Sequence, residues 1–150
     1  MYVFLLGLHN ILRWVVVLAA IYVLYRSYSG LFGRRAYTEA DASSARWFTI
    51  SMDVQLLVGL LLYFVFSPLT REAMRDFGAA MSNTVLRFFA VEHLLMMVVA
   101  VVLAHVGSAQ VKRLTEDRAK FMRSAIWFTL SILLVLASIP WNTRPILPGM

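Results

Sequence analysis

Hydrophobic residues in this chain are concentrated in four long stretches separated by polar connections. The stretches cover residues 3 to 25, 46 to 66, 88 to 107 and 122 to 139. A helix needs about 20 apolar residues to cross the hydrocarbon core of a bilayer, which is roughly 30 Å thick. Each stretch comes close to that length or exceeds it. The pattern therefore predicts an all-α integral membrane protein, built as a single four-helix transmembrane bundle over residues 1 to 150.

The amino-acid composition supports a membrane protein and excludes every kind of site that depends on cysteine. Hydrophobic residues make up 61% of the 150 residues and charged residues only 15%, whereas a soluble domain is about 45–50% apolar. The absence of cysteine excludes disulfides, zinc–thiolate sites, iron–sulfur clusters and covalently attached c-type haem. The first stretch lacks the basic segment and the cleavage site of a signal peptide, so we expect it to be retained.

The distribution of Lys and Arg predicts the orientation. Nine of these residues occupy or border the connections that follow the first and third stretches: Arg26, Arg34, Arg35, Arg46, Lys112, Arg113, Arg118, Lys120 and Arg123. Only four lie on the opposite side: Arg71, Arg75, Arg87 and Arg144. Connections rich in Lys and Arg stay in the cytoplasm, so both termini are expected outside. The net charge of +6 then favours contact with anionic lipid headgroups rather than with nucleic acid.

The connections carry capping and helix-stopping residues. Asp41, Ser43 and Ser44 can cap the second helix. The segment 67–84 begins with Ser-Pro and is a candidate for a short amphipathic helix on the outer surface. Prolines from Pro140 onward end the last helix and predict an extended tail.

Two histidines stand inside the apolar stretches at similar depth. His9 lies about 10 Å along the first helix from its outer end at 1.5 Å per residue, and His93 takes an equivalent position in the third helix, which runs in the same direction. An ionisable side chain at that depth usually marks a functional site. Imidazoles on different helices of a bundle can ligate one haem iron. We therefore predict one b-type haem held between His9 and His93.

Polar neighbours suggest how such a haem would be held. Arg13 is one turn deeper than His9 on the same helix face, and Arg87 is near the outer end of the third helix. Guanidinium groups suit haem propionates, although Arg13 could instead pair with Glu92 or Asp53. Asn10 and Glu92 flank the histidines and could accept the second N–H of an imidazole.

The inner half of the chain has a second group of polar residues. Asp53 and Gln55 lie in the second stretch, and a carboxylate there must pair, line a cavity or stay protonated. Arg13 and Arg46 are candidate partners of Asp53; otherwise Asp53 and His105 could serve as a proton relay. His105 is expected at the headgroup boundary. A second haem between His105 and Met52 is an alternative use of these side chains.

Other functions fit the same polar residues. A membrane histidine can simply bond a carbonyl or hydroxyl of a neighbouring helix, in which case the chain would be a cofactor-free accessory subunit of a respiratory or photosynthetic complex. Alternatively, the polar layer could serve a quinone, or it could conduct protons in a small transport element built on His9, Asp53, Glu92 and His93.

The chain also resembles known membrane proteins. Three groups of residues together resemble the pattern of small bacterial four-helix membrane proteins. They are His9-Asn10 with Arg13-Trp14, Asp53 with Gln55, and Glu92-His93 with Met96-Met97. The architecture is similar to four-helix b-type cytochrome subunits that pass electrons between quinone and a partner enzyme. The resemblance implies a multi-pass protein of the bacterial inner membrane that carries haem b. Such a chain would work with other subunits or as a homo-oligomer, and not as an enzyme on its own.

Overall fold

The structure, a computed structural model, describes residues 1–141. In this range all regular secondary structure is helical, so the prediction of an all-α protein is confirmed. The expected extended tail after Pro140, with Arg144, lies almost wholly outside the described residues.

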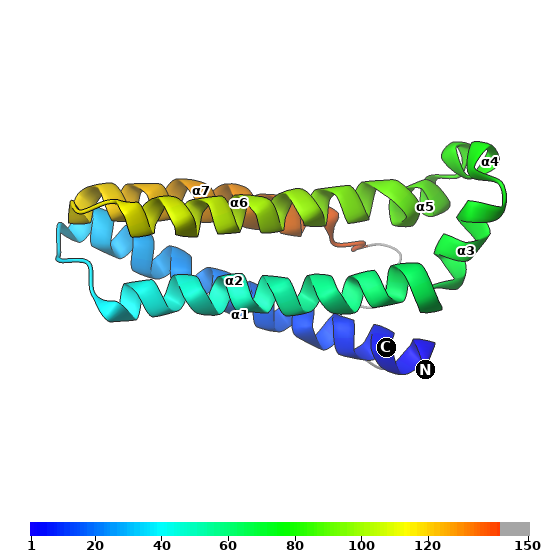
Figure 1. Cartoon of the computed structure of the whole chain (residues 1–150), viewed down its shortest axis with the longest axis horizontal. Helices are drawn as coiled ribbons and strands as arrows, with labels where there is room; N and C mark the ends of the chain where they lie inside the picture. The colour runs from blue at the N-terminus through cyan, green and yellow to red at the C-terminus, as the bar shows by residue number, and fades with distance from the viewer. Residues whose placement is uncertain (142–150) are drawn as a thin grey trace.

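Four long helical segments form the body of the molecule (Figure 1). Helix α1 covers Tyr2–Gly33, α2 covers Glu39–Leu61 and continues as η1 (Leu62–Phe66), α6 covers His93–Arg113 and follows η2 (Phe88–Glu92), and α7 covers Asp117–Ser138. All four segments are long and apolar enough to cross a membrane. The chain is therefore a multi-pass membrane protein by length and composition, as the sequence predicts.

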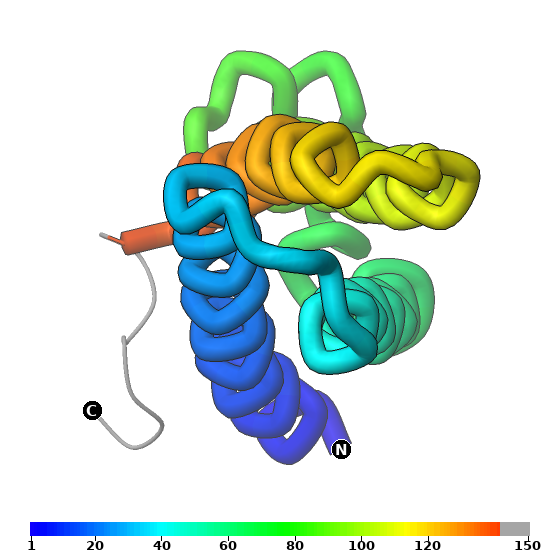
Figure 2. Tube along the Cα trace, turned by 90° about the vertical axis from the view of Figure 1, so that its left-hand side faces the viewer, coloured from blue at the N-terminus to red at the C-terminus, as the bar shows by residue number. Residues whose placement is uncertain are grey.

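The long helices pack side by side around a shared core. Helix α7 packs against α6 and α1, while α2 packs against α1 and, less extensively, α6, which gives the four-cornered arrangement seen along the bundle (Figure 2). The core contains Val16, Val23, Met52 and two aromatic rings, Phe48 and Phe128. The centres of these two rings are 5.5 Å apart, edge to face, a favourable arrangement for aromatic pairs.

The two ends of the bundle differ. We call the end with the connections 34–38 and 114–116 the basic end. The opposite end, the cap end, carries the start of α1 and three short helices, α3 (Pro68–Arg75), α4 (Phe77–Ser82) and α5 (Thr84–Arg87) (Figure 1). The expected helix within residues 67–84 is thus present. It is broken into pieces because Asp76 and Asn83 begin new helices by accepting backbone N–H groups.

The basic end is closed by a cluster around Asp41, whose side chain is only 2% exposed. The carboxylate accepts hydrogen bonds from Arg26 at 2.8 Å, from Arg35 at 2.6 Å and from the backbone N–H of Thr38 at 2.8 Å. The last bond belongs to the N-terminal cap of α2. Because Asp41 accepts from Arg35, it raises the pKa of that guanidinium. The cluster fixes the angle between α1 and α2.

Close helix contacts at the same end depend on glycine. A Cβ atom on Gly30 would collide with the ring of Phe121 in α7, and one on Gly107 would collide with Trp127. Phe121 is buried, and it also contacts the Arg35 guanidinium at 4.7 Å from its ring centre. The four helices are therefore locked together at the basic end, which leaves the cap end as the place where the interior can open.

Candidate functional site

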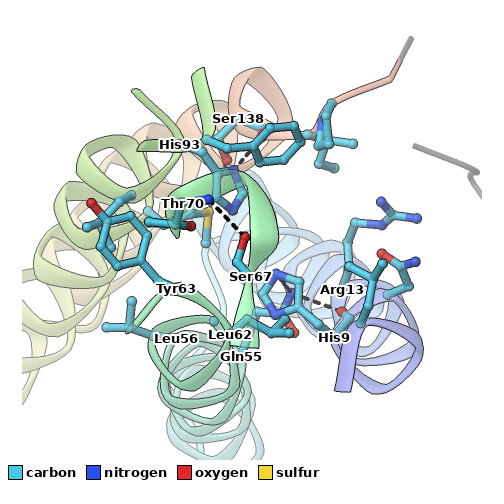
Figure 3. Close-up of a pocket in the computed structure, with 18 of the residues that line it drawn as sticks. His9, Arg13, Gln55, Leu56, Leu62, Tyr63, Ser67, Thr70, His93 and Ser138 are labelled. Atoms are coloured by element: carbon cyan, nitrogen blue, oxygen red, sulfur yellow. Dashed lines mark hydrogen bonds between the residues drawn. The ribbon is translucent and has the colours of Figure 1, made fainter. Parts of the chain in front are cut away.

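A cavity of about 120 Å³ lies inside the bundle toward the cap end. Its wall is mostly apolar, and its polar residues come from the four long helical segments and from the start of α3. They include His9, Asn10, Arg13, Gln55, Tyr63, Ser67, Thr70, His93 and Ser138. Figure 3 shows His9 and Arg13 entering from α1, Gln55 from α2 and His93 from α6. Both predicted histidines therefore face one internal space.

The two imidazole rings are close enough to share a ligand. Their ring centres are 6.4 Å apart and their planes are inclined at 71°. Two imidazoles that bind the same metal ion through bonds of about 2 Å have ring centres roughly 6 Å apart. The separation fits two imidazoles on opposite sides of one metal ion and also fits direct edge-to-face packing of the two rings, although these residues are 84 positions apart in the chain.

His93 is held by the backbone of α7. Its Nδ1 lies 2.8 Å from the carbonyl oxygen of Ser138. Since a carbonyl only accepts, Nδ1 carries the proton and Nε2 keeps its lone pair. Among residues 1–141, Nε2 has no hydrogen-bond partner. This is the protonation state of a histidine that binds a metal through Nε2, where a bond to Nδ1 fixes the tautomer and the ring orientation.

His9 is held by α2 in a different way. The amide nitrogen of Gln55 donates to the backbone carbonyl of His9 at 3.1 Å and lies 3.2 Å from its Nε2. Nε2 then accepts, and the proton of the neutral ring resides on Nδ1. The ring packs against Gly59, where a Cβ atom would approach Cε1 to 3.2 Å.

Two polar atoms in this contact are buried without a hydrogen-bond partner in the described residues. They are Nδ1 of His9 and Oε1 of Gln55. Leaving a buried donor or acceptor unsatisfied costs about 1–3 kcal/mol. Such groups are uncommon in native interiors, and here both belong to side chains of the cavity wall. The wall is thus suited to a ligand that supplies the missing contacts.

Both π-helical segments border the cavity. η1 contributes Leu62 and Tyr63, and η2 contributes Phe89 and leads directly into His93. The hydroxyl of Tyr63 donates to the carbonyl of Ala90 at 2.7 Å, so the two π-helical segments are tied to each other. Single π-helical turns inside α-helices occur frequently at functional sites. The sequence pattern gave no sign of them.

Four of the six residues predicted to hold a cofactor line the cavity: His9, Asn10, Arg13 and His93. The other two, Arg87 and Glu92, pair with each other at 2.7 Å, and Arg87 also donates to the carbonyl of Met81. They are not part of the cavity wall. Arg87 is therefore engaged elsewhere, and the partners of the imidazoles are Gln55 and Ser138 rather than Asn10 and Glu92.

Asp53 and His105 form a separate pair on the other half of the bundle. Nε2 of His105 is 2.7 Å from a carboxylate oxygen of Asp53. Asp53 thus pairs with neither Arg13 nor Arg46, the partners expected from the sequence. Met52 lies in the core with no exposed surface, so it is not placed opposite His105 as a second haem would require.

The described residues contain no group of three or more His, Cys, Asp or Glu side chains that could hold a metal ion. A metal held by protein side chains alone is thus not supported, whereas a bis-imidazole haem needs two protein ligands only. No family model, curated protein or solved structure matches the chain. The argument on function therefore depends on the geometry of the cavity.

Proposed function

We propose that this protein is a membrane-embedded b-type cytochrome subunit in which His9 and His93 hold one haem and pass single electrons. The observation that carries the proposal is the 6.4 Å separation of the two ring centres inside an apolar cavity. We further propose that both termini face outward in a bacterial inner membrane. The excess of Lys and Arg at the basic end supports that orientation.

The donor set fits haem in three respects. His93 has the protonation state of an axial ligand, with Nδ1 on the Ser138 carbonyl. Gly59, which has no Cβ, lets the ring of His9 pack closely against α2. Arg13 is buried in the cavity wall about one turn from His9, where its guanidinium suits a propionate. Haem would supply reversible one-electron chemistry, and two axial imidazoles leave no coordination position for substrate.

Two adjustments accompany this function. His9 would turn from Gln55 toward the middle of the cavity, because its Nε2 lone pair is engaged by the Gln55 amide and its other nitrogen carries the proton. The wall would also move outward, because 120 Å³ is below the roughly 300–1,000 Å³ of common ligand sites. The π-helical segments beside the cavity and the short helices of the cap end are the elements with freedom to do so.

A reduced-minus-oxidised visible spectrum of the purified protein tests the proposal. We expect the paired bands of a b-type cytochrome in the native protein and in His105→Ala, which removes the only other histidine. Both His9→Ala and His93→Ala should lose the low-spin bands, since each removes an axial ligand. Bands that persist unchanged in either variant would contradict the proposal, as would a native protein that contains no haem when it is produced with haem in excess.

A second candidate function, a binding site for the ring of a quinone, is favoured by the cavity as it stands. The N–H of His9 can donate to a carbonyl oxygen, and Nε2 of His93 can accept from the hydroxyl of the reduced form. Such a ring needs less space than a macrocycle. In this alternative the protein binds a short-tailed quinone, and its visible spectrum shows no haem bands. Gln55→Leu weakens quinone binding because the orientation of the His9 ring is lost.

A further inference from the structure

The pair formed by Asp53 and His105 lies on the outside of the bundle rather than in its interior. The side chain of Asp53 is 42% exposed and that of His105 is 51% exposed. Asp53 is seven residues from Arg46 in α2, and His105 is seven residues from Lys112 in α6. At 1.5 Å per residue, the pair lies about 10 Å along the helix axis from these basic residues, which belong to the basic end of the bundle.

Lipid is a poor neighbour for such a pair. Ionisable groups within membrane spans almost always face the bundle interior, a water-filled cavity or another polar group. The flanking positions on the same outward faces are apolar and exposed: Ile50 and Leu57 in α2, Val98 and Val102 in α6. The pair is thus a half-exposed polar island on an otherwise lipid-like surface, and protein is the cover that would satisfy it.

The bonding capacity of the pair is self-complementary. Its internal bond uses Nε2 of His105 and Oδ1 of Asp53. Nδ1 of His105 and Oδ2 of Asp53 have no hydrogen-bond partner in the described part of the chain, so the pair presents one ring nitrogen and one carboxylate oxygen outward. When the pair carries no net charge, one proton lies in the internal bond and the other on Nδ1, so Nδ1 is a donor and the second carboxylate oxygen is an acceptor. Two such pairs facing each other satisfy both groups through reciprocal bonds.

Membrane insertion adds a constraint on depth. Copies of one chain insert with the same orientation, so a two-fold axis that relates them runs along the membrane normal. Every residue then meets its counterpart at its own depth, and residue i contacts residue j in both directions. A polar pair about 10 Å from the basic end therefore meets an identical pair, which an unrelated helix would match only by coincidence.

We propose that the α2–α6 face is the interface of a homodimer in the membrane, centred on Asp53 and His105 of each copy. This proposal is independent of the cofactor. It places the second copy against α2 and α6, which pack less extensively against each other than the other neighbouring long helices do. The reciprocal hydrogen bonds would fix the register of the two copies.

Cysteine cross-linking tests the proposal cleanly because the chain has no cysteine. Val102→Cys places a thiol on the α6 side of the proposed interface. Leu130→Cys is the control on α7. Leu130 is similarly exposed and lies seven residues from Arg123, the spacing that Asp53 and His105 have from Arg46 and Lys112. After oxidation in native membranes and in dilute lipid vesicles, we expect a disulfide dimer of twice the chain mass from Val102→Cys only.

A second variant tests the role of the pair itself. Adding Asp53→Leu and His105→Leu to Val102→Cys should abolish the dimer band while the purified protein keeps its helical content and its unfolding temperature. Equal yields from Val102→Cys and Leu130→Cys would overturn the proposal, as would a cross-link to a protein of different mass or a dimer band that survives the double leucine change in full.

Discussion

The two ends of the bundle solve the problem of buried polar groups in opposite ways. At the basic end, Asp41 accepts bonds from Arg26, Arg35 and the cap of α2, and glycines let the helices touch. Toward the cap end, His9 and Gln55 keep buried polar atoms without partners beside a cavity. Stabilising contacts are therefore concentrated at the basic end. The cap end retains unsatisfied polar groups and a cavity, which are the usual properties of a binding site.

The largest loss of stability should follow Asp41→Ala. Removing one partner of a buried ion pair costs about 3–5 kcal/mol, and the partial exposure of Arg26 and Arg35 places the expected loss near the lower value. Thermal unfolding in detergent measures it. The control is Glu39→Ala, which breaks the exposed pair with Arg46 and should cost less than about 1 kcal/mol. Similar losses in both variants would remove the distinction between the two ends.

A matched pair of glycine substitutions in α1 gives the next largest effect. Gly30→Ala introduces a Cβ that collides with Phe121, and overpacking of this kind costs about 1–3 kcal/mol. Gly7→Ala makes the same chemical change near the cap end, where nothing lies within 4 Å of the new atom. It should be neutral, or stabilising by up to about 1 kcal/mol through helix propensity. Unfolding temperatures that fall equally would show that both ends are packed alike.

Substitution of a cavity histidine should not cause the large loss of stability expected for Asp41→Ala. His9→Leu removes a buried N–H that has no partner and also removes the acceptor of one Gln55 N–H. The two effects oppose each other, so the stability of the apo protein should change by less than about 1 kcal/mol, while ligand binding is lost. Removing a strained or unsatisfied functional group commonly has this double result. Parallel measurements of unfolding temperature and ligand content test it. A variant that both unfolds more easily and keeps its ligand would identify His9 as structural.

The smallest effect is expected at the C-terminus of α1. Arg34 has a φ of 50°, in the left-handed region that costs an L-residue roughly 1 kcal/mol and a glycine almost nothing. Arg34→Gly should therefore raise stability by a few tenths of a kcal/mol, since the greater freedom of glycine in the unfolded chain offsets part of the gain. Chemical denaturation with Arg34→Ala as the control resolves the difference. A loss of stability in the glycine variant would show that the arginine side chain matters more than its backbone.

The number and order of the long helices could be predicted from hydropathy, but their ends could not. Helix α1 continues to Gly33 instead of residue 25, and α2 begins at Glu39 instead of residue 46. Apolar runs measure the thickness of the hydrocarbon, whereas a helix continues into the headgroup region until a cap stops it. The cap of α2 is Thr38, and Asp41 completes its capping box by accepting from the Thr38 backbone N–H. The expected capping by Asp41 is thus confirmed in this form, whereas Ser43 and Ser44 lie inside α2 and do not cap it.

The convergence of His9 and His93 could also be predicted, because matched depth follows from helix direction and residue counting alone. Their partners could not. The bond from His93 goes to the backbone carbonyl of Ser138, a group that every residue possesses, so no side-chain pattern indicates it. Gln55 was visible as a polar residue in an apolar span, yet its contact with His9 depends on the rotation of α2. The same rotation turns Asp53 toward His105 and away from Arg13.

Electron paramagnetic resonance of the oxidised protein tests the central claim most directly, because the spin state of haem iron reports how many imidazoles bind it. We expect one low-spin haem for each chain in the native protein and in His105→Ala, and its loss or conversion to a high-spin centre in both His9→Ala and His93→Ala. A low-spin signal of unchanged amplitude in either of the last two variants would show that His9 and His93 do not share an iron atom.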